Sequence, residues 1–132
     1  MILVDTSVLI DFVRSAQSDS CLTFRKILQQ DIPFGINSFI FQEILQGARS
    51  EKEYHLLKTH LETQRFYHLK DPIDSFARAA KIYMDCRQKG ITIRSTIDCL
   101  IVQTALEHDL FLLHNDNDFN EIAKIVPLKI YW

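Results

Sequence analysis

The chain has 132 residues, 47% of them hydrophobic and 24% charged, and its formal net charge is −2. This length predicts a single domain over residues 1–132, with enough apolar side chains for one core. The balance of 15 basic against 17 acidic residues excludes a protein that grips nucleic acid by bulk positive charge, so any such ligand must be held locally. No apolar run approaches the roughly 18 residues of a membrane span, and no signal peptide is visible, so we expect no membrane partner.

The three cysteines, Cys21, Cys86 and Cys99, form no CxxC pair and are odd in number. This pattern is typical of reduced thiols in a protein that stays inside the cell. We therefore expect a cytoplasmic location.

Short strands and helices are predicted to alternate along the chain. In chain order, the first half is expected to contain a strand at 2–5, helices at 6–14 and 20–30, a strand at 34–36, a helix capped by Asn37 or Ser38, and a helix at 51–62. The second half is expected to contain a strand at 66–69, a helix from Pro72 to a stop at Gly90, a helix that opens at Ser95, a strand at 110–113, one helical turn after Asp118, and a strand at 128–131. The strand at 2–5 is expected to be fully buried, because the run ILV has no polar face.

Apolar residues at helical spacing predict which faces of these helices are buried. On the helix at 20–30 we expect burial of Leu22, Ile27 and Leu28. On the helix that follows Pro72, the residues that recur at helical spacing are Ile73, Phe76, Ala77, Ala80, Tyr83 and Met84.

Four acidic residues, Asp5, Glu43, Asp98 and Asp116, lie where a predicted strand gives way to a helix or within the first turns of a helix. In an open α/β sheet the ligand crevice lies beyond the carboxyl ends of the parallel strands, so such side chains can converge. A cluster of oxygen ligands is what Mg²⁺ or Mn²⁺ requires, and it indicates phosphodiester chemistry.

Each acid also has a structural explanation. Asp5 can cap the first helix, Asp98 can form a capping box with Ser95, and Asp116 can belong to a simple turn. Glu43 is harder to explain, because apolar residues flank it and an unpaired carboxylate on an apolar face costs several kcal/mol. Two carboxylates about 4 Å apart repel by roughly 4 kcal/mol at an effective dielectric near 20, so a converged cluster indicates a bound cation.

Other classes of site are poorly supported. The three glycines are isolated, so there is no phosphate-binding loop, and no Ser, His and Asp are arranged around a nucleophile elbow. No two histidines are spaced to bind zinc on one helix face. His114 alone stands out, because it lies two residues before Asp116.

The segments VDTSVLID, QEILQGA and STIDCLIVQTALEHDLFLLHNDNDF, together with the total length, resemble a PIN-domain ribonuclease, most closely the VapC-type toxin of toxin–antitoxin pairs. The resemblance covers essentially the whole chain. It implies an α/β fold with three α/β/α layers around a central parallel sheet. It also implies an RNA substrate, a cognate antitoxin whose tail covers the active site, and a homodimer.

The same resemblance places the family's metal-binding acids on Asp5, Glu43, Asp98 and Asp116. We expect Asp5 and Asp98 to hold the first Mg²⁺ or Mn²⁺, with the other two acids completing its shell directly or through water. Further expected contributors are hydroxyl groups near the phosphate or metal, a supplementary acid, and a basic residue for the phosphate backbone, namely Thr6, Ser7, Ser95, Asp118 and Arg94.

Two alternatives stay open at this point. The same scaffold suits a metal-dependent DNA nuclease or a phosphatase. From a different class, a non-catalytic binding module would use its acidic pocket only to dock an arginine of a partner. The sequence supports best a metal-dependent endoribonuclease toxin.

Overall fold

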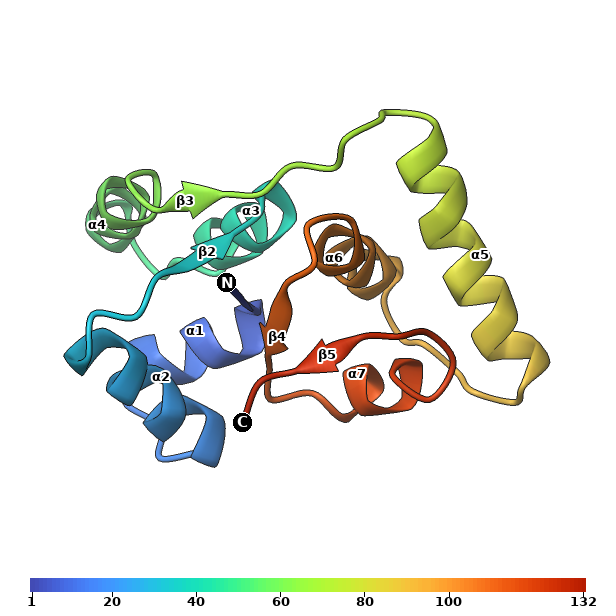
Figure 1. Ribbon diagram of the computed structural model, residues 1–132. Helices are drawn as coiled ribbons and strands as arrows, with labels where there is room; N and C mark the ends of the chain where they lie inside the picture. The colour runs from blue at the N-terminus through green and yellow to red at the C-terminus, as the bar shows by residue number, and fades with distance from the viewer.

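The computed structural model describes residues 1–132, and its helices surround one parallel sheet (Figure 1). The strands are β1 (Ile2–Val4), β2 (Phe34–Ile36), β3 (Arg65–Phe66), β4 (Phe111–Leu113) and β5 (Lys129–Ile130). The helices are α1 (Thr6–Val13), α2 (Asp19–Gln29), α3 (Ser38–Gln46), α4 (Glu51–Leu61), α5 (Asp74–Gln88), α6 (Thr96–Glu107) and α7 (Asn117–Ile122). Every predicted element is present, with boundaries shifted by a few residues at most.

The sheet has the strand order β3-β2-β1-β4-β5, and all its neighbouring strands are parallel. The chain therefore moves outward from β1 in one direction through β2 and β3, and then returns to place β4 on the other side of β1. The carboxyl ends of β1 and β4 lie next to each other at this reversal, with Val4 aligned to Leu113. Reversals of this kind are where open parallel sheets bind their ligands.

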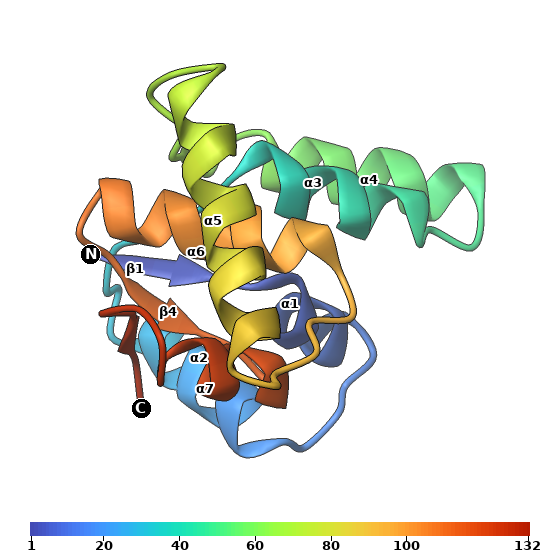
Figure 2. The same ribbon diagram turned by 90° about the vertical axis from the view of Figure 1, so that its right-hand side faces the viewer.

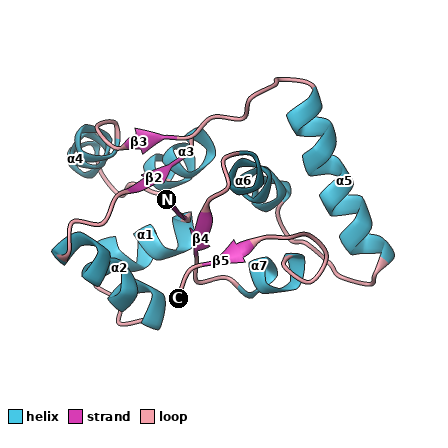
Figure 3. Cartoon of the chain, in the orientation of Figure 1, coloured by secondary structure: helices cyan, strands magenta, loops and turns pink.

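Helices cover both faces of the sheet, which confirms the predicted three-layer α/β/α fold. Figure 2 shows β1 and β4 between a layer that contains α5 and α6 and a layer that contains α2 and α7. The strands are short, and helices make up most of the molecule (Figure 3). One apolar cluster fills the interior, and Leu3 and Val4 of β1 are fully buried in it, as the run ILV predicts. No helix has both the length and the apolar character that crossing a membrane requires.

The predicted buried faces of two helices are wrong in part, although Ile27 of α2 is buried as predicted and Tyr83 of α5 packs against the core. On α2, Leu22 and Leu28 are 42% and 43% exposed, and the buried side chains are Cys21, Phe24 and Ile27. The helix buries positions three residues apart, so its inner face is rotated by one residue from the pattern that the leucines indicate.

On α5 the buried residues are Ser75, Ala79, Ile82 and Cys86, and all of them except Ile82 are small. Ile73 is 80% exposed and Phe76 is 43% exposed. The small residues allow α5 to pack closely on α6, and Phe76 and Tyr83 are not fully buried but line a groove with Thr96, Cys99 and Leu100 of α6. The turn after α5 contains Gly90, whose φ of 77° ends the helix at the predicted position.

Candidate metal centre

Asp5 lies directly after β1 and caps α1, and it is 4% exposed. Its Oδ2 atom accepts hydrogen bonds from the Ser7 backbone N–H at 3.0 Å and from the Ser7 hydroxyl at 2.6 Å. Burial raises the pKa of Asp5 to about 6, although the bonds from Ser7 oppose this rise. The structural explanation of Asp5 as a cap is therefore correct, but the cap is a buried carboxylate with a strongly altered pKa.

Glu43, on α3, contacts the residue that follows Asp5. The Thr6 hydroxyl donates to Glu43 Oε1 at 2.8 Å, and this bond joins α1 to α3. The Glu43 charge contributes to the raised pKa of both Asp5 and Asp98. Thus the three acids of β1, α3 and α6 lie within electrostatic reach of one another. We call Asp5, Thr6 and Glu43 the buried half of the site.

Asp98 lies in the first turn of α6, and Ser95 caps that helix. The Ser95 hydroxyl accepts from the Ile97 backbone N–H at 3.2 Å. Burial raises the pKa of Asp98 to about 7, and the charges of Asp5, Asp116, Asp118 and Glu43 raise it further. No hydrogen bond opposes this rise, so a capping box does not account for Asp98.

Asp116 and Asp118 follow β4 at the start of α7. Asp116 caps the helix and accepts from the Asp118 backbone N–H at 3.0 Å. One carboxylate oxygen from each of Asp98, Asp116 and Asp118 lies within 4.8 Å of the other two. Asp118, expected only as a supplementary acid, therefore lies inside the tightest acidic group of the site.

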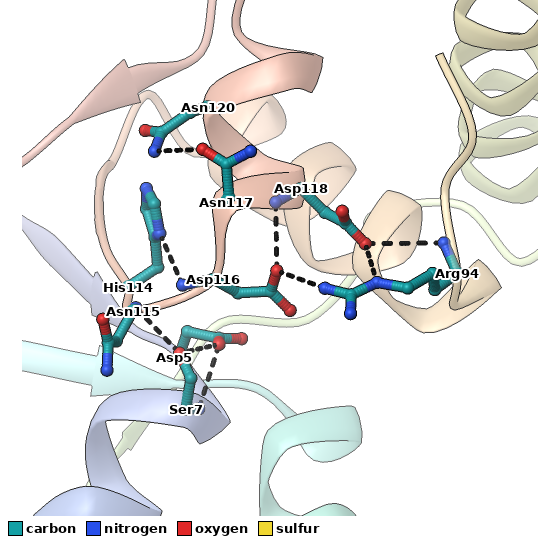
Figure 4. A network of polar contacts seen from close by, with 9 residues as sticks. All are labelled: Asp5, Ser7, Arg94, His114, Asn115, Asp116, Asn117, Asp118 and Asn120. Atoms are coloured by element: carbon teal, nitrogen blue, oxygen red, sulfur yellow. Dashed lines mark hydrogen bonds and ion pairs between the residues drawn. The ribbon is translucent and has the colours of Figure 1, made fainter.

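Arg94 binds both Asp116, which caps α7, and Asp118 in the first turn of that helix (Figure 4). Its Nε donates to Asp118 Oδ2 at 3.1 Å, and its Nη2 donates to Asp116 Oδ1 at 3.1 Å. The arginine side chain is 72% exposed, whereas the side chains of Asp116 and Asp118 are 29% and 13% exposed. We call Asp116, Asp118 and Arg94 the arginine-paired half of the site.

The loop between β4 and α7 is held to α1 by Asn115, a residue that no sequence pattern singled out. The Asn115 backbone N–H donates to the Ser7 hydroxyl at 2.9 Å, and its side chain donates to Asp11 Oδ2 at 2.7 Å. His114 Nδ1 accepts from the Asp116 backbone N–H at 3.1 Å. The two bonds of Asn115 join the loop to α1, so no periodic pattern within either segment could have indicated them, whereas the bond between His114 and Asp116 is local.

The donor set and the charges fit a divalent cation. All the converging groups are carboxylate or hydroxyl oxygens, which are the ligands of Mg²⁺ and Mn²⁺. Two ionised carboxylates about 5 Å apart repel by roughly 3 kcal/mol at an effective dielectric near 20. This excess of negative charge helps to raise the pKa of Asp98, and Arg94 partly neutralises the charge by pairing with Asp116 and Asp118. A cation between Asp98, Asp116 and Asp118 would relieve the same repulsion.

The chain is similar in sequence to a known family and to proteins within it. A family model described as the PIN domain matches residues 2–125. Ribonuclease VapC11 of Mycobacterium tuberculosis is 34% identical over 130 residues, which cover 98% of this chain and 96% of the relative. Ribonuclease VapC17 of the same organism is 33% identical over 87 residues, which cover 64% of each chain.

Solved structures with the same fold have low sequence identity. The structure of VapBC2 from Rickettsia felis bound to a promoter DNA fragment matches with a TM-score of 0.73 and 18% identity, over 100% of this chain and 99% of the other. The structure of FitAcB from Neisseria gonorrhoeae matches with a TM-score of 0.70 and 19% identity, over 100% and 97% of the two chains. Because the family model spans most of the chain and the VapC11 similarity spans nearly all of it, the chain belongs to the PIN-domain family, among its VapC-type members.

Proposed function

We propose that this protein is a metal-dependent endoribonuclease and the toxin of a toxin–antitoxin pair. The observation that carries the proposal is the convergence of acids from distant segments at the carboxyl ends of β1 and β4. Asp98, Asp116 and Asp118 form the tightest group, and Asp5 and Glu43 act on it electrostatically. The nearly full-length similarity to VapC11, a protein named as a ribonuclease, supports RNA as the substrate.

Mg²⁺ or Mn²⁺, when bound, would supply Lewis-acid chemistry, since such an ion lowers the pKa of water and neutralises charge on phosphoryl oxygens. Asp98 and Asp116 would hold this ion from α6 and α7, and Asp118 would complete the group. Asp5 would contribute from the end of β1. Its hydrogen bonds with Ser7 occupy Oδ2 and leave Oδ1 free for the site.

Glu43 and Thr6 would position the attacking water. Glu43 Oε1 already accepts from the Thr6 hydroxyl, so its orientation is fixed while Oε2 stays free to accept a proton or a hydrogen bond. The water attacks phosphorus in line and the ribose 3′ oxygen leaves, so the expected products carry a 5′-phosphate and a 3′-hydroxyl. The ribose 2′-hydroxyl takes no part as a nucleophile.

Mapping of the cut ends tests this mechanism. RNA digested by the purified protein with Mn²⁺ should give 5′-phosphate ends that ligate directly, and EDTA should stop the reaction. A 2′-deoxy substitution at the scissile nucleotide should slow cleavage only modestly, through lost recognition. Cleavage that continues in EDTA, or ends with a 2′,3′-cyclic phosphate, would contradict the metal-carboxylate mechanism.

One observation favours a second candidate, a binding module whose acidic pocket docks an arginine of a partner. Arg94 shows that a guanidinium group fits against Asp116 and Asp118. The two candidates differ in what Asp98→Ala does to a bacterial host. The endoribonuclease predicts that the wild type arrests growth and that this variant is tolerated, whereas equal toxicity of both would favour the binding module.

The partners follow from the same proposal. The structural neighbours include toxin–antitoxin complexes, so we infer a cognate antitoxin that covers the acidic site and restores growth on co-expression. A homodimer stays a prediction, and light scattering on the purified chain would test it. An RNA substrate and three free cysteines are consistent with a cytoplasmic location.

A further inference from the structure

A polar cleft of about 470 Å³ lies beside the acidic group, and Asp116 is part of its wall. The cleft runs from the start of α2 past the β4–α7 loop to the residues after β5. Its volume lies in the range of clefts that take small ligands, about 300–1,000 Å³. A ligand in this cleft would therefore sit directly next to the proposed metal centre.

The charge of this cleft is wrong for a phosphate group. Its twelve lining residues include no Lys or Arg, and the charged ones are the acids Asp19 and Asp116. The other polar linings are neutral amides and hydroxyls, with one imidazole. An uncharged ligand with donors and acceptors suits these walls, and a nucleobase is such a ligand.

Two asparagines on α7 present a matched pair of hydrogen-bonding groups. Asn117 and Asn120 are exposed, and their side chains share one hydrogen bond of 3.3 Å between an N–H and an oxygen. The bond leaves the NH₂ group of Asn117 and the amide oxygen of Asn120 outside it, and this oxygen can accept from the His114 ring with one of its two lone pairs while the other stays available. An acceptor and a donor side by side match the edge of an unpaired base.

The same cleft carries flat rings on which a base can stack. Tyr131 and Trp132 follow β5, and Trp132 is 88% exposed. The ring of His114 is fixed by the bond from the Asp116 N–H and by packing against Phe119. Figure 4 shows this ring beside Asn120.

We propose that this cleft binds one unpaired base of the RNA substrate, adjacent to the phosphate that is cut, and so contributes to the choice of cleavage site. Asn117 and Asn120 read the edge of the base, and Tyr131 with Trp132 stacks on its face. This inference rests on the proposed ribonuclease function, since that function supplies the RNA. It assigns the selection of sequence to side chains that lie outside the acidic site.

Binding is measured by NMR in EDTA, where no metal-dependent cleavage occurs. The probes are the four ribonucleoside 5′-monophosphates, with inorganic phosphate at the same concentration as the control. Trp132 is the only Trp of the chain, so its indole N–H gives one unambiguous signal. We expect this signal and the side-chain amides of Asn117 and Asn120 to shift with at least one nucleotide and not with phosphate. Absence of shifts with all four nucleotides, or equal shifts with phosphate, would overturn the proposal.

Variants then link binding to cleavage. Tyr131→Leu should weaken nucleotide binding roughly tenfold, the order found for stacked bases, whereas Tyr54→Leu on the distant α4 should not change it. Asn117→Ala combined with Asn120→Ala should raise KM or change the cleaved sequence, with the response to Mn²⁺ kept. If these variants cleave the same site with unchanged KM, the cleft proposal is wrong while the ribonuclease function stands. If wild type shows nucleotide shifts but never cleaves RNA, the proposed function fails instead.

Discussion

The two halves of the acidic site balance their negative charge by different means. In the buried half, the carboxylates of Asp5 and Glu43 are held by short-range donors, namely Ser7 and Thr6. In the arginine-paired half, Asp116 and Asp118 share the guanidinium group of Arg94. The hydrogen bonds from Ser7 and Thr6 hold the carboxylates of the buried half in one orientation, whereas the exposed side chain of Arg94 can move away from Asp116 and Asp118.

Asp98 lies between the two halves and has neither kind of compensation. Its pKa of about 7 results from burial and from four neighbouring acids, without a hydrogen bond that opposes them. The fold thus prepares most of the site but leaves one carboxylate uncompensated. Asp98 is therefore the residue at which a bound cation would change the energy most.

The largest expected effect is on cleavage. Asp98→Asn keeps the size of the side chain and removes its charge, so RNA cleavage should fall by more than about 100-fold, since even residues that only support metal ligands cost 10- to 100-fold. The matched control is Asp74→Asn, an exposed acid on α5 that pairs with Arg78. Cleavage is measured as initial rate with Mn²⁺. A loss of less than tenfold in Asp98→Asn would contradict its proposed role.

The next effect concerns the response of stability to metal. Mn²⁺ at about 100 times its dissociation constant should add roughly 2.7 kcal/mol to the free energy of unfolding, which raises Tm by roughly 10 °C in a chain of this size. Asp98→Asn should lose most of this rise, and Asp74→Asn should keep it. Calorimetry with and without EDTA measures both. A Tm of the wild type that does not respond to millimolar Mn²⁺ would count against the metal centre.

A smaller effect appears in the pH dependence without metal. Folding raises the pKa of Asp98 from 3.8 to about 7, so the folded protein binds the extra proton between these values. The stabilising contribution of Asp98 is therefore fully present below 3.8 and is lost as the pH rises through about 7.

Asp98→Asn has no such loss. Its Tm relative to the wild type should increase as the pH rises from about 4 to about 8, by the equivalent of about 1–2 kcal/mol after allowance for the partial exposure of Asp98. Saturating Mn²⁺ should reverse the order of the two proteins at the higher pH. If the difference in Tm between the two proteins does not change with pH, other groups compensate the charge of Asp98 and this prediction is wrong.

The sequence predicted some parts of the molecule better than others. The strands and helices follow from local patterns, such as the apolar run ILV before Asp5, and all of them are present. The predicted inner face of α5 was wrong in part, because Ala79 and Ser75 are buried by close packing between helices rather than by their hydrophobicity. The periodic pattern within one helix carries no information about how closely that helix packs against another.

The acidic site shows the same limit. The position of Asp116 after a strand and of Asp98 in the opening turn of a helix predicted that the two would come together, and each contributes an oxygen to a group of atoms that lie within 4.8 Å of one another. The inclusion of Asp118 and the link between Asn115 and Asp11 depend on how one loop folds. The pairing of Arg94 with Asp116 and Asp118 joins residues 22 and 24 positions apart, and from the sequence Arg94 was expected only at the phosphate backbone.

The smallest expected effect tests the arginine-paired half directly. Because Arg94 and a divalent cation would use the same carboxylates, Arg94→Gln should tighten Mn²⁺ binding, by about two- to fivefold given the modest strength of exposed ion pairs. Arg78→Gln is the matched control, since Arg78 forms a similarly exposed pair with Asp74 outside the site. Isothermal titration calorimetry in low salt gives the dissociation constants, and the difference should shrink at high salt, where exposed charges are screened. If Arg94→Gln instead weakens Mn²⁺ binding, the arginine supports the metal ligands rather than competing with the metal, and both halves of the site would be prepared by the fold in the same way.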